Sequence, residues 1–121
     1  MKIVLNGAPR TKKNSQQIVK LHGHYCIISS KAYKEYEQSC LWQIRRPAKP
    51  IGTRVNVKCI YYMPTRRRVD LCNLLEATCD ILVKAGVLAD DNSAVVASHD
   101  GSRVLWDKEN PRVEVEISGV E

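Results

Sequence analysis

The clearest guide to the fold is residues 70–86, which read DLCNLLEATCDILVKAG. Asp70 is a favoured N-cap residue and Gly86 a favoured residue just past a C-cap, so we expect a helix that opens at Asp70 and closes near Ala85. Helical spacing predicts a core-facing side made of Leu71, Leu74, Leu75, Thr78 and Leu82. The exposed stripe repeats every four residues and consists of Cys72, Glu76, Asp80 and Lys84.

Strand patterns and another helix lie on both sides of this segment. Residues 54–63 alternate between apolar and polar, as a half-buried strand requires. Ser29 or Ser30 is a favourable cap for a helix that runs to about Ile44 and ends before Pro47. Further strands are predicted at residues 1–6, 16–21, 25–29, 94–99 and 112–117, with His22, Gly23 and His24 as a hairpin turn. We therefore expect an α/β (α+β) fold, a two-layer domain of two helices packed on a mixed, mainly antiparallel sheet.

Length and composition favour one domain. The chain has 121 residues, which are too few to divide comfortably into two cores, so residues 1–121 are expected to form a single domain. No run approaches the roughly 18 to 20 apolar residues of a membrane span, and residues 1–7 form a strand pattern without a secretory leader. Five cysteines without a CxxC pair predict reduced, mostly buried thiols. We expect a cytoplasmic protein that does not bind membranes.

Charge is unevenly distributed along the chain. The net charge is +6, but residues 1–68 hold 15 Lys and Arg against 2 Asp and Glu, whereas residues 69–121 hold 4 against 11. A basic half favours a polyanionic partner, because each phosphate that is neutralised releases condensed counterions. The alternative is that the basic charge serves only solubility. An acidic half has no such use, so its carboxylates are either scattered over the surface or gathered to hold cations.

The segment that carries chemistry joins both kinds of charge. Arg66, Arg67 and Arg68 stand directly before the helix that Asp70 opens, and Asp90 and Asp91 follow that helix. Guanidinium groups bind phosphates bidentately, and nearby carboxylates hold Mg²⁺, which activates water for phosphodiester cleavage. The positive end of the helix dipole repels a metal ion, so a site at Asp70 needs further carboxylates. Asp90 and Asp91 are the expected suppliers.

Each piece of this segment also has a simpler interpretation. Asp70 is a good helix cap whether or not it binds a metal. Asp90 and Asp91, followed by Asn92, are typical of a polar turn. The three arginines suit a solvated loop. Lys12, Lys13 and Asn14 suit either a loop that grips a nucleic-acid backbone or a plain surface loop.

Residues 66–92, RRRVDLCNLLEATCDILVKAGVLADDN, resemble the RusA-type crossover junction endodeoxyribonucleases (Holliday junction resolvases) of phages and prophages. Weaker similarity lies at residues 7–14 and 30–36. The resemblance implies a small α/β homodimer that binds four-way DNA junctions and nicks two opposing strands symmetrically with Mg²⁺ or Mn²⁺. Such a dimer presents two sites to the junction, so paired cuts follow from its symmetry.

The resemblance also implies roles for particular residues. Asp70 matches the first essential aspartate of the family and Asp91 the last, with Asp90 beside it, so these three are the expected metal ligands and catalytic carboxylates. Two positions depart from the pattern: Cys72 replaces an aspartate that many relatives carry, and Glu76 replaces a lysine. Other matches are Asn73, Asp80 and Lys84, and the expected DNA-binding residues are Lys12, Lys13, Asn14, Arg66, Arg67, Arg68 and Lys84.

Glu76 and Cys72 are four residues apart on one helical face. We hypothesise that Glu76 leans toward the N-terminal turn and supplies the missing carboxylate as a further catalytic residue. The alternative is that Glu76 belongs to a solvated row of charges with Asp80 and Lys84. Two other functions remain open: a junction-binding protein with weak or no catalysis, favoured by Cys72, and a general basic nucleic-acid-binding module.

Overall fold

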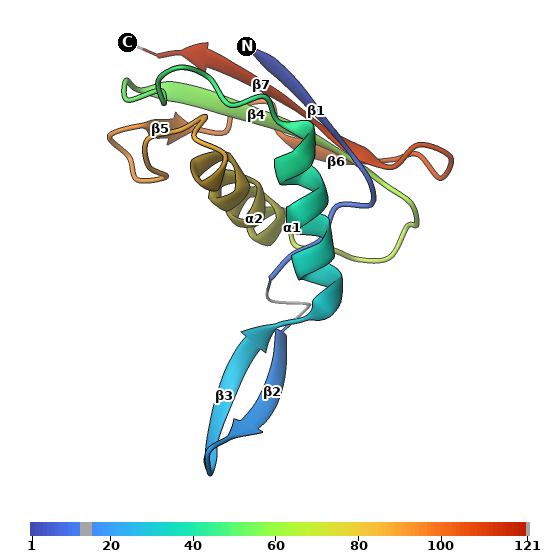
Figure 1. Ribbon diagram of the computed structural model, residues 1–121. Coiled ribbons are helices and arrows are strands. Elements are labelled where there is room, and N and C mark those ends of the chain that lie inside the picture. Colours follow the sequence, from blue (N-terminus) through green and yellow to red (C-terminus); the bar gives the residue numbers. More distant parts are fainter. Residues whose placement is uncertain (13–15, 121) are drawn as a thin grey trace.

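The fold is a mixed five-stranded sheet with both helices on one of its faces, from which a separate hairpin projects (Figure 1). The computed structural model describes residues 1–12 and 16–120. The elements in chain order are β1 (Lys2–Asn6), β2 (Gln16–Leu21), β3 (His24–Ser29), α1 (Lys31–Gln43), β4 (Val55–Met63), α2 (Leu71–Lys84), β5 (Val96–Ser98), β6 (Arg103–Trp106) and β7 (Arg112–Gly119). The α+β class and the two-layer arrangement that the sequence predicted are confirmed.

Strand β4 is the centre of the main sheet. It pairs antiparallel with β7 on one side, and β1 continues the sheet beyond β7, also antiparallel. On its other side, β4 pairs in parallel with two short strands, β5 at its beginning and β6 at its end. The sheet is therefore mixed, and β6, which the sequence reading did not identify, forms an edge beside the last residues of β4.

The core lies between the sheet and the helices. Val57, Cys59 and Tyr61 of β4 are fully buried, as the alternation of this strand predicted. The Tyr61 hydroxyl forms a buried 2.7 Å hydrogen bond with Thr78 Oγ1 in the middle of α2. Leu82, one helical turn after Thr78, belongs to the same core and is fully buried as well. These contacts hold α2 against the sheet, and so they position the loops that precede and follow this helix.

The boundaries of both helices follow the predicted caps. Ser30 caps α1, with its Oγ accepting a hydrogen bond from the Tyr33 amide, and Asp70 caps α2. After α2 the chain turns at Gly86, which has φ of 76°. This left-handed backbone conformation, rather than the space around it, favours glycine there, because the side chain nearest to an added Cβ is the flexible Arg46.

Strands β2 and β3 form a two-stranded sheet of their own that extends away from the body of the molecule (Figure 1). The turn between them is His22 and Gly23, both with positive φ, which is the geometry of a two-residue hairpin turn and confirms the predicted hairpin. Neither helix within the described ranges has the length and apolar character needed to cross a bilayer.

Candidate functional site

The arginine-rich segment is the loop that joins β4 to α2. Strand β4 ends at Met63, whose carbonyl oxygen accepts a 2.9 Å hydrogen bond from the Asp107 amide next to β6. Within the loop, the Arg67 amide donates to Thr65 Oγ1 at 3.4 Å. The loop ends at Asp70, the cap of α2. The arginines are thereby held between the end of the central strand and the N-terminal end of α2.

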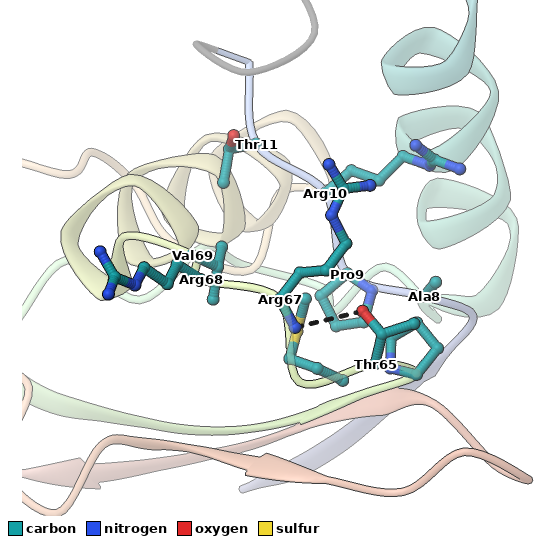
Figure 2. Close-up of a pocket in the computed structure, with 10 residues that line it drawn as sticks. Ala8, Pro9, Arg10, Thr11, Thr65, Arg67, Arg68 and Val69 are labelled. Atoms are coloured by element: carbon teal, nitrogen blue, oxygen red, sulfur yellow. Dashed lines mark hydrogen bonds between the residues drawn. The ribbon is translucent and has the colours of Figure 1, made fainter.

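A pocket of about 430 Å³ opens beside this loop. Its lining combines the loop with the segment that follows β1: Ala8, Pro9, Arg10, Thr11, Met63, Pro64, Thr65, Arg67, Arg68 and Val69. The Arg67 side chain extends toward Arg10, while Arg68 points away from both (Figure 2). Three of the lining residues are arginines and none carries a carboxylate, so the pocket is suited to a phosphate.

Arg10 was not among the residues that the sequence suggested for nucleic-acid contacts. The sequence did contain a hint of its role, because Arg10 stands two residues before Lys12 in the same basic segment. Sequence alone does not show that the segment after β1 crosses beside the segment after β4. That neighbourhood results from β1 and β4 both pairing with β7.

Arg66 occupies a different position from the other two arginines of the loop. Its guanidinium carbon lies 4.4 Å from the ring centre of Trp106 on β6, in a cation–π contact. Arg66 is absent from the pocket lining. Trp106 was missed by sequence reasoning, because its strand was not predicted.

Asp70 is exposed at the same end of α2 as the arginine pocket. Its Oδ1 accepts a 2.9 Å hydrogen bond from the Cys72 amide, which confirms the interpretation of Asp70 as the helix cap. The cap uses one carboxylate oxygen and leaves Oδ2 outside this bond. A second role for Asp70, as a metal ligand or catalytic group, stays a prediction.

Asp90 and Asp91 lie beyond the opposite end of α2. The chain returns from that end through Leu88, which forms a bridge with Ile51 and whose amide donates to the Leu82 carbonyl. Asp90 organises a polar turn, with Oδ1 accepting from the Asp91 amide at 2.7 Å. Both aspartates are exposed. The turn that the sequence offered as a simpler interpretation of this pair is confirmed.

The two ends of α2 are far apart within one chain. Fourteen helical residues span roughly 21 Å at about 1.5 Å per residue. Asp91 lies close enough to Cys79, in the second half of α2, for its charge to help raise the pKa of that thiol, although burial is the largest cause. Across residues 1–12 and 16–120, no three histidine, cysteine or acidic side chains gather closely enough to hold a metal ion. The predicted convergence of Asp70 with Asp90 and Asp91 stays a prediction.

The lysines predicted to contact DNA are paired with acids where they are described. Lys12 Nζ donates to Asp80 Oδ2, and this hydrogen bond raises the pKa of Lys12 against the opposing effect of burial. The charges of Glu37 and Glu76 raise it further. Lys84 Nζ lies 2.9 Å from Glu37 Oε2. These pairs link the segment after β1 and helix α1 to the outer stripe of α2.

The other residues for which the sequence predicted a role are either exposed or lie outside the residues that the structure describes. Cys72 and Glu76 are both exposed on α2. Cys72 differs in this from Cys40, Cys59 and Cys79, which are buried, and all four are free thiols. Lys13 and Asn14 fall outside the described residues. The predicted roles of Glu76 and of the DNA-binding lysines remain open.

Comparison with known proteins gives two matches. A family model described as endodeoxyribonuclease RusA matches residues 6–118, which is nearly the whole chain. A curated protein of Aquifex aeolicus (strain VF5), described as crossover junction endodeoxyribonuclease RusA, is 32% identical over 59 residues. That match covers 47% of this chain and 47% of the relative, so the similarity spans about half the length of the relative.

Proposed function

This chain belongs to the RusA family of endodeoxyribonucleases, and from that membership we propose that it is a DNA endonuclease that resolves four-way (Holliday) junctions by paired, symmetric nicks. The observation that carries the proposal is the arginine pocket beside Asp70 at the N-terminal end of α2. Metal-assisted phosphodiester cleavage uses groups that hold the phosphate and a carboxylate that holds the metal ion, and this end of the helix offers both.

The pocket residues have distinct tasks in this proposal. Arg10 and Arg67, which line the pocket from the segments after β1 and after β4, hold a backbone phosphate and neutralise part of its charge. Arg68 contacts the neighbouring backbone. Asp70 keeps its Oδ1 in the helix cap and uses Oδ2 on the cleavage side. The α2 cap therefore fixes the orientation of the carboxylate that the chemistry uses.

We propose Mg²⁺, or Mn²⁺, as the cofactor. One chain does not by itself gather three ligands within the described residues, but Mg²⁺ is commonly held by one or two carboxylates together with substrate phosphates. Asp70 and Asp91, with Asp90 beside it, would supply such carboxylates. When bound, the cation would stabilise negative charge on the phosphate and lower the pKa of a water molecule.

A homodimer is part of the proposal, because symmetric nicks in opposing strands need two equivalent sites. A two-fold dimer presents two copies of the arginine pocket and of Asp70. Sedimentation velocity of the purified protein would measure this directly. We expect a species of twice the mass of the chain, and a monomer at micromolar concentration would contradict this part of the proposal.

The test of the function compares a synthetic four-way junction with a linear duplex of equal length, each incubated with the protein in Mg²⁺ or in EDTA. We expect paired nicks in the junction, in Mg²⁺ only, and little cleavage of the duplex. Equal binding to the junction and the duplex, without cleavage of either, would favour a general nucleic-acid-binding module instead.

A second candidate function is junction binding with weak or no cleavage, and Cys72 favours it. This exposed thiol stands where many relatives have an aspartate, and a thiol is a poor ligand for Mg²⁺. Replacing Cys72→Asp would raise the nicking rate if the missing carboxylate limits catalysis. Glu76→Ala tests whether Glu76 substitutes for it: unchanged nicking by this variant would exclude that role, whereas a loss would support it.

A further inference from the structure

Strand β6 carries an apolar surface that the fold does not cover. Val104, Leu105 and Trp106 are 37%, 42% and 48% exposed, although strand residues of this size are normally buried. Within the described residues, β6 pairs with β4, and its other edge is open. Packing against the core therefore does not account for a tryptophan at this position.

Trp106 is held in place from one side by an arginine. Arg66 stacks over its ring at 4.4 Å, and Arg66 is itself exposed. The contact keeps a cation next to the indole and limits rotation of both side chains. An exposed aromatic ring beside a guanidinium group is the combination that binds nucleobases in single-stranded nucleic acid.

The ring also lies next to the arginine pocket. Trp106 is the register partner of Met63, and Met63 lines the pocket. Neighbouring strands are about 4.8 Å apart, so the indole and the pocket belong to adjacent strands of one surface. A phosphate in the pocket would therefore place its nucleotide beside the strand that carries Trp106.

We propose that Trp106, backed by Arg66, is a stacking surface for a nucleobase that the branch point of bound DNA leaves unpaired. The positive charge of Arg66, Arg67 and Arg10 around this surface favours nucleic acid over an apolar protein partner. The inference rests on the proposed binding of branched DNA and adds how the branch is distinguished from the interior of a duplex: stacking is interrupted at a branch point, whereas every base inside a duplex is stacked on both faces.

The test uses a four-way junction with 2-aminopurine at the branch point, whose fluorescence falls when the base stacks on an aromatic ring. We expect wild-type protein to quench this fluorescence and Trp106→Leu to leave it unquenched, with junction binding about tenfold weaker and duplex binding unchanged. Trp42→Leu is the matched control, because Trp42 is 81% exposed near the C-terminal end of α1, does not line the arginine pocket, and should behave as wild type.

Unchanged quenching and unchanged junction affinity in Trp106→Leu would overturn the inference. So would a Trp106→Leu variant that sediments as a monomer while the wild type is a dimer, because a second copy of the chain would then cover the indole. Urea denaturation verifies that the variant is folded. A wild-type protein that quenches 2-aminopurine but never nicks DNA would refute the nuclease proposal while supporting the stacking surface.

Discussion

The two ends of helix α2 carry the same kind of side chain in different surroundings. At the N-terminal end, Asp70 stands next to a pocket lined by Arg10, Arg67 and Arg68. At the C-terminal end, Asp90 and Asp91 occupy an exposed polar turn. A carboxylate beside phosphate-binding arginines, such as Asp70, is placed to act on a phosphodiester. The Asp90 carboxylate accepts a hydrogen bond within its own turn and has no arginine pocket beside it among the described residues. The proposed DNA contact is therefore assigned to the N-terminal end of α2.

The largest expected effect concerns Asp70 itself. Asp70→Asn keeps a good N-cap but removes the negative charge, so it separates the structural role from the chemical one. We expect the nicking rate on a four-way junction to fall about 100-fold or more, because a carboxylate at the reacting phosphate contributes several kcal/mol. Urea denaturation should show a nearly unchanged free energy of unfolding.

Asp91→Asn, measured in the same nicking assay, tests the other end of the helix. The proposed site includes Asp91, so we expect a comparable loss. Wild-type nicking by Asp91→Asn together with a large loss in Asp70→Asn would restrict the chemistry to the N-terminal end. Full nicking activity in Asp70→Asn would mean that Asp70 serves only as the cap of α2.

The next effect in size concerns phosphate binding by Arg67. Arg67→Ala should weaken junction binding about tenfold, since a hydrogen bond to a charged group contributes roughly 1.5–3 kcal/mol. The slope of the logarithm of affinity against the logarithm of salt concentration should fall by about one. Fluorescence anisotropy titrations at several salt concentrations measure both quantities. Lys49→Ala, an exposed cation outside the pocket, is the control and should change the affinity little.

A smaller effect is expected where α2 is anchored between its ends. Tyr61→Phe removes the buried hydrogen bond to Thr78 and should lower the free energy of unfolding by about 1–2 kcal/mol. Tyr62→Phe, on the neighbouring half-buried position, is the control. Equal urea midpoints for the two variants would mean that the bond between β4 and α2 does not stabilise the fold.

The smallest effect at neutral pH concerns the buried thiol of Cys79. Burial, with the charges of nearby groups including Asp91, raises its pKa from 9.0 to about 12. A raised folded-state pKa contributes stability below pH 9 that is lost as the pH rises toward 12, because the unfolded thiol ionises first. Urea midpoints between pH 8 and 11 should fall less steeply in Cys79→Ala than in wild type. The exposed Cys72→Ala should follow wild type, and parallel curves for all three proteins would contradict the shift.

Local patterns in the sequence were sufficient for much of the fold. The caps Ser30 and Asp70, the turn at Gly86 and the alternation of β4 all depend on neighbouring residues, and the structure confirms them. Strand β6 was missed because it is short and is formed by parallel pairing with β4, which is distant in sequence. Its residue Trp106 therefore could not be placed beside Arg66.

The site was harder to predict than the fold, for a related reason. Spacing along the chain identified the arginines and the aspartates, but the distance between them depends on the direction and length of α2. The helix that begins at Asp70 runs for 14 residues before the chain turns back toward Asp90, and no local pattern gives the direction of that return. Arg10 joins the pocket only because β1 and β4 share β7 as a neighbour.

Amide hydrogen exchange of the full chain, with and without a four-way junction, tests most directly whether DNA lies at the N-terminal end of α2. The account predicts slower exchange at residues 8–12 and 65–70, and unchanged exchange at residues 45–49, which follow α1 and do not line the arginine pocket. Protection confined to residues 89–94, with none around the arginine pocket, would contradict it.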